Sequence, residues 1–294
     1  MQTLITVAPT GAEVSKREAP ALPVTIDELV VAAKECEALG ASVIHIHIRD
    51  DEARPTLDLG RLRETTQAVR AATGLIVQLS SGGAVTDPEE HRLAVLDAAP
   101  DMASCTMGTV NFGDDVFLNR WEFIVDLHTR MQEKNIVPEY EIFDLGHLAA
   151  LERLLDKHGL PAGGHVHTDL VMGVPGGMAG TADTLVACVH AMRDLPEGTT
   201  FSATGIGRTT VPVMLASLSA GGHLRVGMED TVSYARGEPV ESNMQLVARA
   251  VAFARLAQRS PLTPDRARAL LGIGSGSARS ELERPAVATD DGTV

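Results

Sequence analysis

Eight short runs rich in β-branched residues recur along the chain, and each is followed by a segment whose apolar residues have helical spacing. The runs are residues 4–9, 42–48, 75–81, 101–108, 137–143, 164–173, 199–205 and 223–229. The helical patterns cover residues 26–40, 59–74, 89–99, 120–134, 148–159, 181–195, 211–222 and 242–257. Regular alternation of strand and helix is typical of parallel α/β folds. Eight such units predict a (β/α)8 TIM barrel, with a doubly wound open sheet as the alternative.

The repeating pattern stops near residue 273, so we predict one catalytic barrel domain over residues 1–273. Residues 274–294 are rich in glycine, serine and acidic side chains and lack apolar periodicity. Such composition cannot bury enough apolar surface to order a segment. We therefore expect residues 274–294 to form a partly disordered C-terminal extension.

Charge and hydropathy exclude two classes of partner. The 294 residues carry a formal charge of −14, and no run is rich in lysine or arginine, which argues against nucleic acid. No window approaches the roughly 20 apolar residues of a membrane span, and the first residues do not resemble a secretion signal. We expect a soluble, cytoplasmic protein.

The cysteines give no sign of a disulfide framework. Cys36, Cys105 and Cys188 are far apart in the sequence, and none forms a CxxC pair. Free cysteine commonly packs as a small apolar residue. We predict that all three lie in the core.

The second run, SVIHIHIRDDEARP (residues 42–55), places two histidines within an isoleucine-rich strand. Side chains alternate between the faces of a strand, so His45, His47 and Arg49 share one face. The isoleucines between them suit the face beneath the helices, so the histidines should point into the barrel. Imidazoles one pleat apart can bind one metal ion. A hydrogen-bonded pair of core histidines is the alternative.

The last run, HLRVGMEDTV (residues 223–232), supplies a third candidate ligand. The alternation places Arg225 and Glu229 in the lumen, and Asp230 follows at the end of the strand. Two histidines and a carboxylate with open coordination positions suit catalytic zinc, and equally non-haem iron. An arginine beside an aspartate can hold a general base, whereas a simple lumen salt bridge is the alternative for Arg225 and Asp230.

A second H-x-H pair, His165 and His167, competes as a metal site. About six residues separate this pair from the carboxyl end of its strand, where barrel enzymes do their chemistry. We therefore interpret both histidines as packing residues in the lower or middle part of the barrel.

Further polar residues point inward from the predicted strands or lie in the loops that follow them, although each could also serve turn or cap formation. They are Glu13, Ser80, Ser104, Thr106 and Glu141. Two glycine-rich loops, residues 173–181 and 203–212, follow the sixth and seventh strands, where barrels often bind phosphates. The second loop contains Gly205, Gly207 and Arg208, and Arg208 is a candidate for contacting a phosphate- or thioester-bearing ligand.

The motifs together resemble the β-keto acid cleavage enzyme family. They are, in chain order, TGAE, IHIHIRDD, SSGGA, NFGDD, PEYEIFD, GVPGGM, GIGR, VGMED and ESNMQLV. The resemblance extends from about Leu4 to Ile273 and is greatest to members that cleave 3-keto-5-aminohexanoate in lysine fermentation.

The resemblance implies a zinc-dependent barrel that condenses a β-keto acid with acetyl-CoA, yielding acetoacetate and a new CoA ester. It implies that His45, His47 and Glu229 hold the zinc and that Arg225 and Asp230 form the base dyad. The substrate pocket would be lined by Glu13, Ser80, Ser104, Thr106 and Glu141. The co-substrate acetyl-CoA would be bound by Gly205, Gly207 and Arg208. A homotetramer is also implied, with 3-keto-5-aminohexanoate as the leading substrate because Glu13 would attract an amine.

Two other functions remain open. A metal-dependent hydrolase of the amidohydrolase type also uses an H-x-H motif, but on its first strand and with a further histidine on the fifth. Here the pair is on the second strand, and the fifth has no histidine. A barrel that binds a CoA-like metabolite without chemistry would not need a base dyad.

Overall fold

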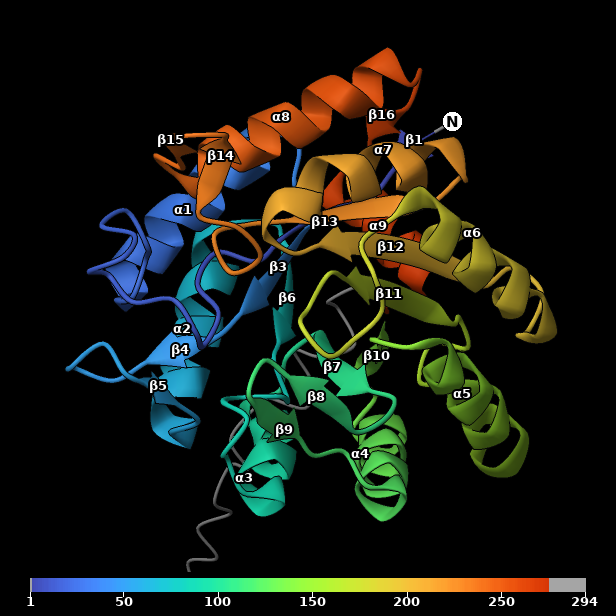
Figure 1. Cartoon of the computed structure of the whole chain (residues 1–294). Helices are drawn as coiled ribbons and strands as arrows, with labels where there is room; N and C mark the ends of the chain where they lie inside the picture. Colours follow the sequence, from blue (N-terminus) through green and yellow to red (C-terminus); the bar gives the residue numbers. More distant parts are fainter. Residues whose placement is uncertain (1, 275–294) are drawn as a thin grey trace, which may run out of the picture.

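A closed barrel of parallel strands forms the centre of the molecule (Figure 1). The computed structural model describes residues 2–274, so residues 275–294 of the predicted extension lie outside the described residues. Within that range the strands are β2 (Ile5–Val7), β3 (Val43–Ile46), β6 (Ile76–Leu79), β7 (Met102–Thr106), β10 (Val137–Ile142), β11 (His167–Met172), β12 (Thr200–Gly205) and β13 (His223–Val226). They close in this order, with β13 beside β2. The TIM barrel is confirmed and the open-sheet alternative is wrong.

Helices surround the barrel. They are α1 (Ile26–Leu39), α2 (Leu59–Ala72), α3 (Glu89–Ala94), α4 (Trp121–Glu133), α5 (Leu145–His158), α6 (Ala182–Ala191), α7 (Thr210–Ser219) and α8 (Asn243–Leu256), with short 3₁₀ turns η1 (Val95–Ala98), η2 (Met192–Asp194) and η3 (Gly207–Thr209). Each lies in a predicted helical segment, give or take a few residues. Local signals explain their starts: Thr25 accepts from the Glu28 amide, and the Glu28 side chain accepts from the Thr25 amide.

The core lies between the outer faces of the strands and the helices. Ile44, Ile46 and Ile48 are buried there among residues of α1, α2 and α8, as the alternation predicts. The intervening His45 faces the barrel interior and is only 1% exposed. All three cysteines are free and buried, as predicted for core residues.

The amino-terminal end of the barrel is closed by a helix that the sequence reading missed. Helix α9 (Pro264–Leu271) packs Ala267 and Leu271 against the first residues of several strands, including Leu4 and Val43. β1 (Gln2–Thr3) pairs with β16 (Ser260–Pro261) beside it. The helix has only eight residues, too few for a clear periodic signal.

The second H-x-H pair lies toward this end of the barrel. His167 is fully buried, and its Nδ1 is 2.8 Å from the Thr200 hydroxyl oxygen. His165 Nε2 lies 2.8 Å from the same hydroxyl oxygen. Both histidines are therefore held by hydrogen bonds, His167 in the packed interior and His165 half-buried beside it, in agreement with the predicted packing role.

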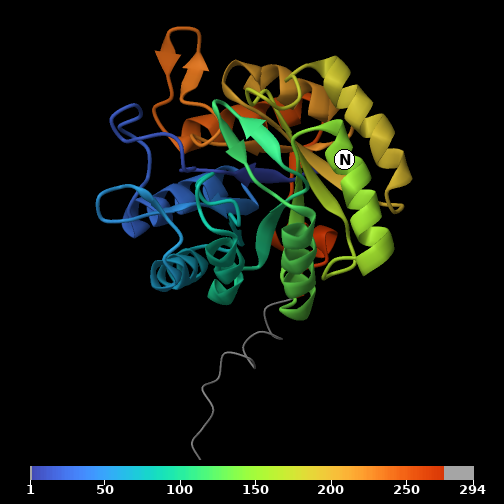
Figure 2. The same cartoon turned by 60° about the horizontal axis from the view of Figure 1, so that its bottom comes forward.

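Short hairpins rise from the opposite, carboxyl-terminal end. They are β4–β5 (Ile48–Arg49 and Pro55–Thr56), β8–β9 (Val110–Phe112 and Asp115–Phe117) and β14–β15 (Ser233–Ala235 and Glu238–Pro239). Figure 2 shows β8–β9 and β14–β15 at the same end of the molecule. No helix within residues 2–274 combines the length and apolar character that crossing a membrane requires.

Candidate active site

Three candidate ligands converge at the carboxyl end of the barrel. His45 and His47 come from β3 and the residue after it, and Glu229 follows β13. One ligand atom from each lies within 4.8 Å of the others. The Nε2 atoms of both histidines are 3.7 Å from Glu229 Oε1. Residues separated by more than 180 positions in the sequence thus meet because β2 alone lies between β3 and β13.

The surroundings of this cluster suit a metal ion. His45 Nδ1 lies 2.6 Å from the side-chain oxygen of Gln78, which can only accept, so Nδ1 carries the hydrogen and Nε2 is free to coordinate. Glu229 Oε2 is buried and has no hydrogen-bond partner. An unpartnered buried carboxylate oxygen is costly unless a cation balances it. The residues present therefore fit a bound divalent metal.

Glu229 reaches the cluster from a turn, which corrects the predicted strand. β13 ends at Val226, three residues earlier than the predicted run. A side chain on Gly227 would lie 1.8 Å from the Ala8 carbonyl oxygen, so β13 and the end of β2 approach closely there. The Glu229 amide then donates to Ala8 O at 3.2 Å, and the Asp230 amide to Gly227 O at 3.0 Å.

Arg225 connects the metal-ligand cluster to the predicted base. Its Nε and Nη2 donate to the two carboxylate oxygens of Asp230 at 3.4 and 3.0 Å, and Nη2 also donates to Glu229. Nη1 makes no hydrogen bond but lies 3.6 Å from Glu141 and 3.8 Å from Asp169. The Arg225–Asp230 ion pair is present, as both the dyad and the salt-bridge interpretations require.

The charges of the cluster are set by burial and by Arg225. Burial alone would raise the pKa of Glu229, but the attraction of Arg225 and His47 outweighs it and holds the pKa at about 2. Burial lowers the pKa of His47 to about 4. Burial, reinforced by Glu229 and opposed by Arg225, raises the pKa of Asp230 to about 6. An ionised Glu229 and a neutral His47 are the forms that bind metals.

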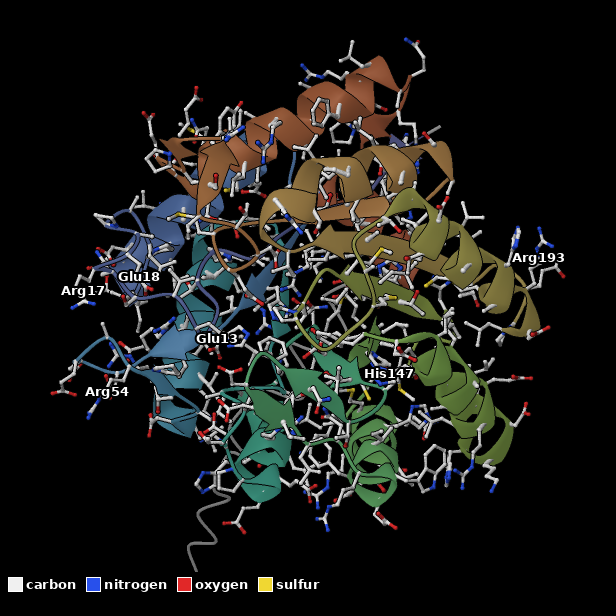
Figure 3. The ribbon with its side chains drawn as sticks, viewed as in Figure 1. Glu13, Arg17, Glu18, Arg54, His147 and Arg193 are labelled. Atoms are coloured by element: carbon white, nitrogen blue, oxygen red, sulfur yellow. The ribbon has the colours of Figure 1, made fainter. Side chains whose placement is uncertain are left out.

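A cavity of about 360 Å³ opens beside the cluster. Its polar lining includes His47, Glu229, Arg225 and Asp230, together with four other predicted site residues: Glu13, Ser80, Glu141 and Gly207. Glu13 is exposed, and Figure 3 shows it on the inner side of its loop, while Arg17 and Glu18 point outward. Gly207 also supports the base, because its amide donates to Asp230 O at 2.8 Å.

Five predicted residues are not among those that line the cavity: the buried candidate ligand His45 and the four described next. Ser104 is fully buried, and its hydroxyl accepts from the Ser81 amide at 3.1 Å, so it supports the loop that carries Ser80. Thr106 is also buried and donates to Glu141 at 2.6 Å. A side chain on Gly205 would lie 2.5 Å from Thr209 O. Arg208 is exposed on η3, and its contact with acetyl-CoA stays a prediction.

Three polar residues that support the site were given no role from the sequence. Gln78 orients His45, and its polar side chain within an apolar strand could have revealed it. Arg49 donates to Gly11 O at 2.7 Å and to Val14 O at 2.8 Å, which fixes the loop carrying Glu13. Asp169 accepts from the Thr204 hydroxyl at 2.7 Å beneath Arg225. For Arg49 and Asp169, polarity alone does not distinguish a role in the site from an ordinary hydrogen bond in the core.

Comparison with known proteins places the whole chain in a family. The family model described as beta-keto acid cleavage enzyme matches residues 2–273. The chain belongs to this family. Within the family it is 37% identical over 276 residues to the 3-keto-5-aminohexanoate cleavage enzyme of Acetoanaerobium sticklandii, covering 92% of this chain and 98% of that protein.

Other relatives of this chain carry different names. The 3-oxoadipate:acetyl-CoA acetyltransferase of Cupriavidus necator is 34% identical, with 92% and 95% of the two chains covered. The 3-dehydrocarnitine:acetyl-CoA trimethylamine transferase of Rhizobium meliloti is 31% identical, with 92% and 97% covered. Family membership does not favour the hydrolase alternative.

A likeness to solved structures supports the fold. The apo structure of ObcA superposes with a TM-score of 0.75 at 18% identity, covering 87% of this chain and 66% of that chain.

Proposed function

We propose that this chain is a zinc-dependent enzyme that condenses a β-keto acid with acetyl-CoA and releases acetoacetate and a new CoA ester. The observation that carries the proposal is the single cavity into which His47, Glu229, Arg225 and Asp230 all project. A metal-ligand set beside a buried carboxylate and arginine suits removal of a proton next to a carbonyl. The names of the relatives, which pair keto acids with acetyl-CoA, support the same reaction.

Zinc would be held by His45, His47 and Glu229, the cluster with the unpartnered Glu229 oxygen. When bound, it would supply Lewis-acid polarisation of the 3-keto group. The same ligand set also suits iron, and zinc is preferred here because of the resemblance to the family.

The chain's own residues then account for the proton transfers. Asp230, oriented by Arg225, removes a proton from C2 of the keto acid, and the resulting carbanion attacks the acetyl carbonyl carbon of acetyl-CoA. A carbon–carbon bond forms and the CoA thiolate leaves. The thiolate adds to the original keto carbon, and the bond between that carbon and C2 breaks. The products are the new CoA ester and the acetoacetate carbanion, which takes the proton back from Asp230.

The leading candidate substrate is 3-keto-5-aminohexanoate. Glu13 lines the cavity from the loop after β2, where a carboxylate attracts an amine and repels a second acid group. The relative from Acetoanaerobium sticklandii that bears this substrate in its name supports the choice. On this assignment the enzyme acts in lysine degradation. The resemblance also supports a cytoplasmic location and a homotetramer. Light scattering on the purified protein would test the number of subunits.

The decisive experiment is turnover of 3-keto-5-aminohexanoate with acetyl-CoA, followed by acetoacetate formation. We expect turnover to require acetyl-CoA and to disappear after chelation and return with added Zn²⁺. His47→Ala should lose both zinc and activity while its circular dichroism matches that of the wild type. Full zinc content in this variant would contradict the metal site. Metal-dependent hydrolysis without CoA would indicate the hydrolase, and ligand binding without turnover would indicate the binding protein.

A further inference from the structure

The cavity has two chemically different sides. The strand order places β13, β2 and β3, with the metal-ligand cluster, opposite β7, β10 and β11. On this opposite side the lining is mainly apolar and comes mostly from the segments that follow those strands, with Glu141 of β10 as its acidic member. We call it the phenylalanine wall, and it consists of Phe112, Phe117, Phe143, Val171, Val174 and Ile206.

The wall is held in place by its own packing. The rings of Phe112, Phe117 and Phe143 contact one another edge to face, with centroids 6.2 to 6.5 Å apart. The Phe143 amide donates at 3.2 Å to Nδ1 of His147, a residue of the first turn of α5 that is labelled in Figure 3. Arg92 lies 4.8 Å from the centre of the Phe117 ring and is itself buried. A fixed apolar surface can bind a ligand without first ordering its side chains.

Charge also separates the two sides. Of the described residues that line the cavity, the cationic or titratable nitrogen bases are Arg225 and His47. Arg225 is already paired with Glu229 and Asp230, and His47 belongs to the metal-ligand cluster. A carboxylate placed against the phenylalanine wall would therefore lose water without gaining a cation.

We propose that the phenylalanine wall binds the apolar atoms of the β-keto acid's tail, the part beyond the keto carbon, while an amine carried by that tail faces Glu13. The inference rests on the proposed function, because the keto group must face the metal-ligand cluster for the tail to reach the opposite side. The chain accordingly uses keto acids with longer uncharged tails more efficiently than short ones. It rejects an otherwise equal tail that ends in a carboxylate.

A substrate series tests the wall directly. The purified enzyme, supplied with Zn²⁺ and saturating acetyl-CoA, is assayed with 3-ketopentanoate, 3-ketohexanoate, 3-ketoheptanoate and 3-oxoadipate. We expect kcat/KM to rise about three- to fourfold for each added methylene, the usual effect of burying one such group. 3-Oxoadipate differs from 3-ketohexanoate only in its terminal carboxylate and should be turned over at least tenfold less efficiently.

A variant identifies the residues responsible. Phe112 is partly exposed on the β8–β9 hairpin, outside the barrel core. We therefore expect Phe112→Ala to fold like the wild type and to flatten the dependence on tail length. Phe253→Ala on α8 is the matched control, because this ring packs against the core outside the cavity, and the length dependence should survive. The KM for acetyl-CoA should stay unchanged in Phe112→Ala.

The outcomes separate the two proposals. Absence of turnover with every keto acid would contradict the proposed function itself. Turnover of 3-keto-5-aminohexanoate without any gain from longer tails would contradict the phenylalanine wall alone. An equal loss for all keto acids in Phe112→Ala, with a raised KM for acetyl-CoA, would show that the wall binds the pantetheine arm and would overturn the inference.

Discussion

Gly11 offers a test of how the backbone holds the metal-ligand cluster. It has φ +64°, and a side chain at this position would begin 2.6 Å from Glu229 Cγ. Gly113 has the same φ of +64°, but nothing lies within 4 Å of the position of its missing side chain. Gly11→Ala and Gly113→Ala therefore carry the same energetic cost of a left-handed backbone. They differ in that only the new side chain at Gly11 contacts Glu229.

The magnitudes follow from this comparison. A left-handed backbone costs a residue other than glycine roughly 1 to 2 kcal/mol, so both variants should lose about that much free energy of unfolding. Gly11→Ala should lose about 1 to 3 kcal/mol more, because overpacking displaces Glu229 from its ion pair with Arg225. Displacing the ligand should also weaken zinc binding by about 10- to 100-fold, the range found when the support of a metal ligand is removed.

Two measurements check this prediction. Urea denaturation in the presence of EDTA gives the free energy of unfolding of the metal-free protein, and competition with a chromogenic chelator gives the zinc affinity. Gly113→Ala should keep the zinc affinity of the wild type. Equal zinc affinities in the two variants would refute the role assigned to Gly11 and Glu229.

Three further predictions concern the base, the mouth of the cavity and the core. Asp230→Asn should retain zinc, but its turnover rate should fall by about 100-fold or more. A near-normal rate would indicate that Arg225 and Asp230 form only a structural salt bridge. Glu13→Gln should lower kcat/KM for 3-keto-5-aminohexanoate about two- to fivefold and leave 3-ketohexanoate nearly unchanged, because Glu13 is exposed and screened by water. Burial of His128 on α4 lowers the pKa of its imidazole to about 4 in the folded protein, against 6.5 in the unfolded chain. As the pH falls from 6.5 to 4, the unfolded chain therefore binds a proton at this residue that the folded chain does not bind. The free energy of unfolding should therefore fall by about 3 kcal/mol over this pH range. Urea denaturation between pH 7 and 4 should show a smaller fall in the free energy of unfolding for His128→Gln than for the wild type.

The alternation of strands and helices predicted the barrel, and the alternation of side chains along the strands predicted that His45, His47 and Glu229 meet. These features depend on the repeat of two residues along a strand and on the closure of parallel strands, and both can be followed in a sequence. The end of β13 could not be predicted, because it depends on how closely Gly227 approaches Ala8 in space. The turn nevertheless directs Glu229 to the same side that a longer strand would have reached.

Side-chain alternation was less informative about which inward residues face the cavity. Ser104 and Thr106 are polar but buried, and neither lines the cavity. Their hydroxyl groups form hydrogen bonds with Ser81 and Glu141, respectively. Thr106 is level in strand register with Glu141, which does line the cavity, so the local packing of side chains decides this rather than the alternation. The phenylalanine wall was also missed, because Phe112 and Phe117 lie on strands of three residues each.

Helix α9 has a consequence for how the protein is made. The barrel cannot be covered at its amino-terminal end until residues 264–271 have left the ribosome, because α9 packs on the first residues of strands synthesised much earlier. Until then Leu4, Val43, Ile76 and Met102 present an uncovered apolar surface. A nascent chain stalled before α9 should therefore be recognised by chaperones, even though every residue of the metal-ligand cluster has already been made.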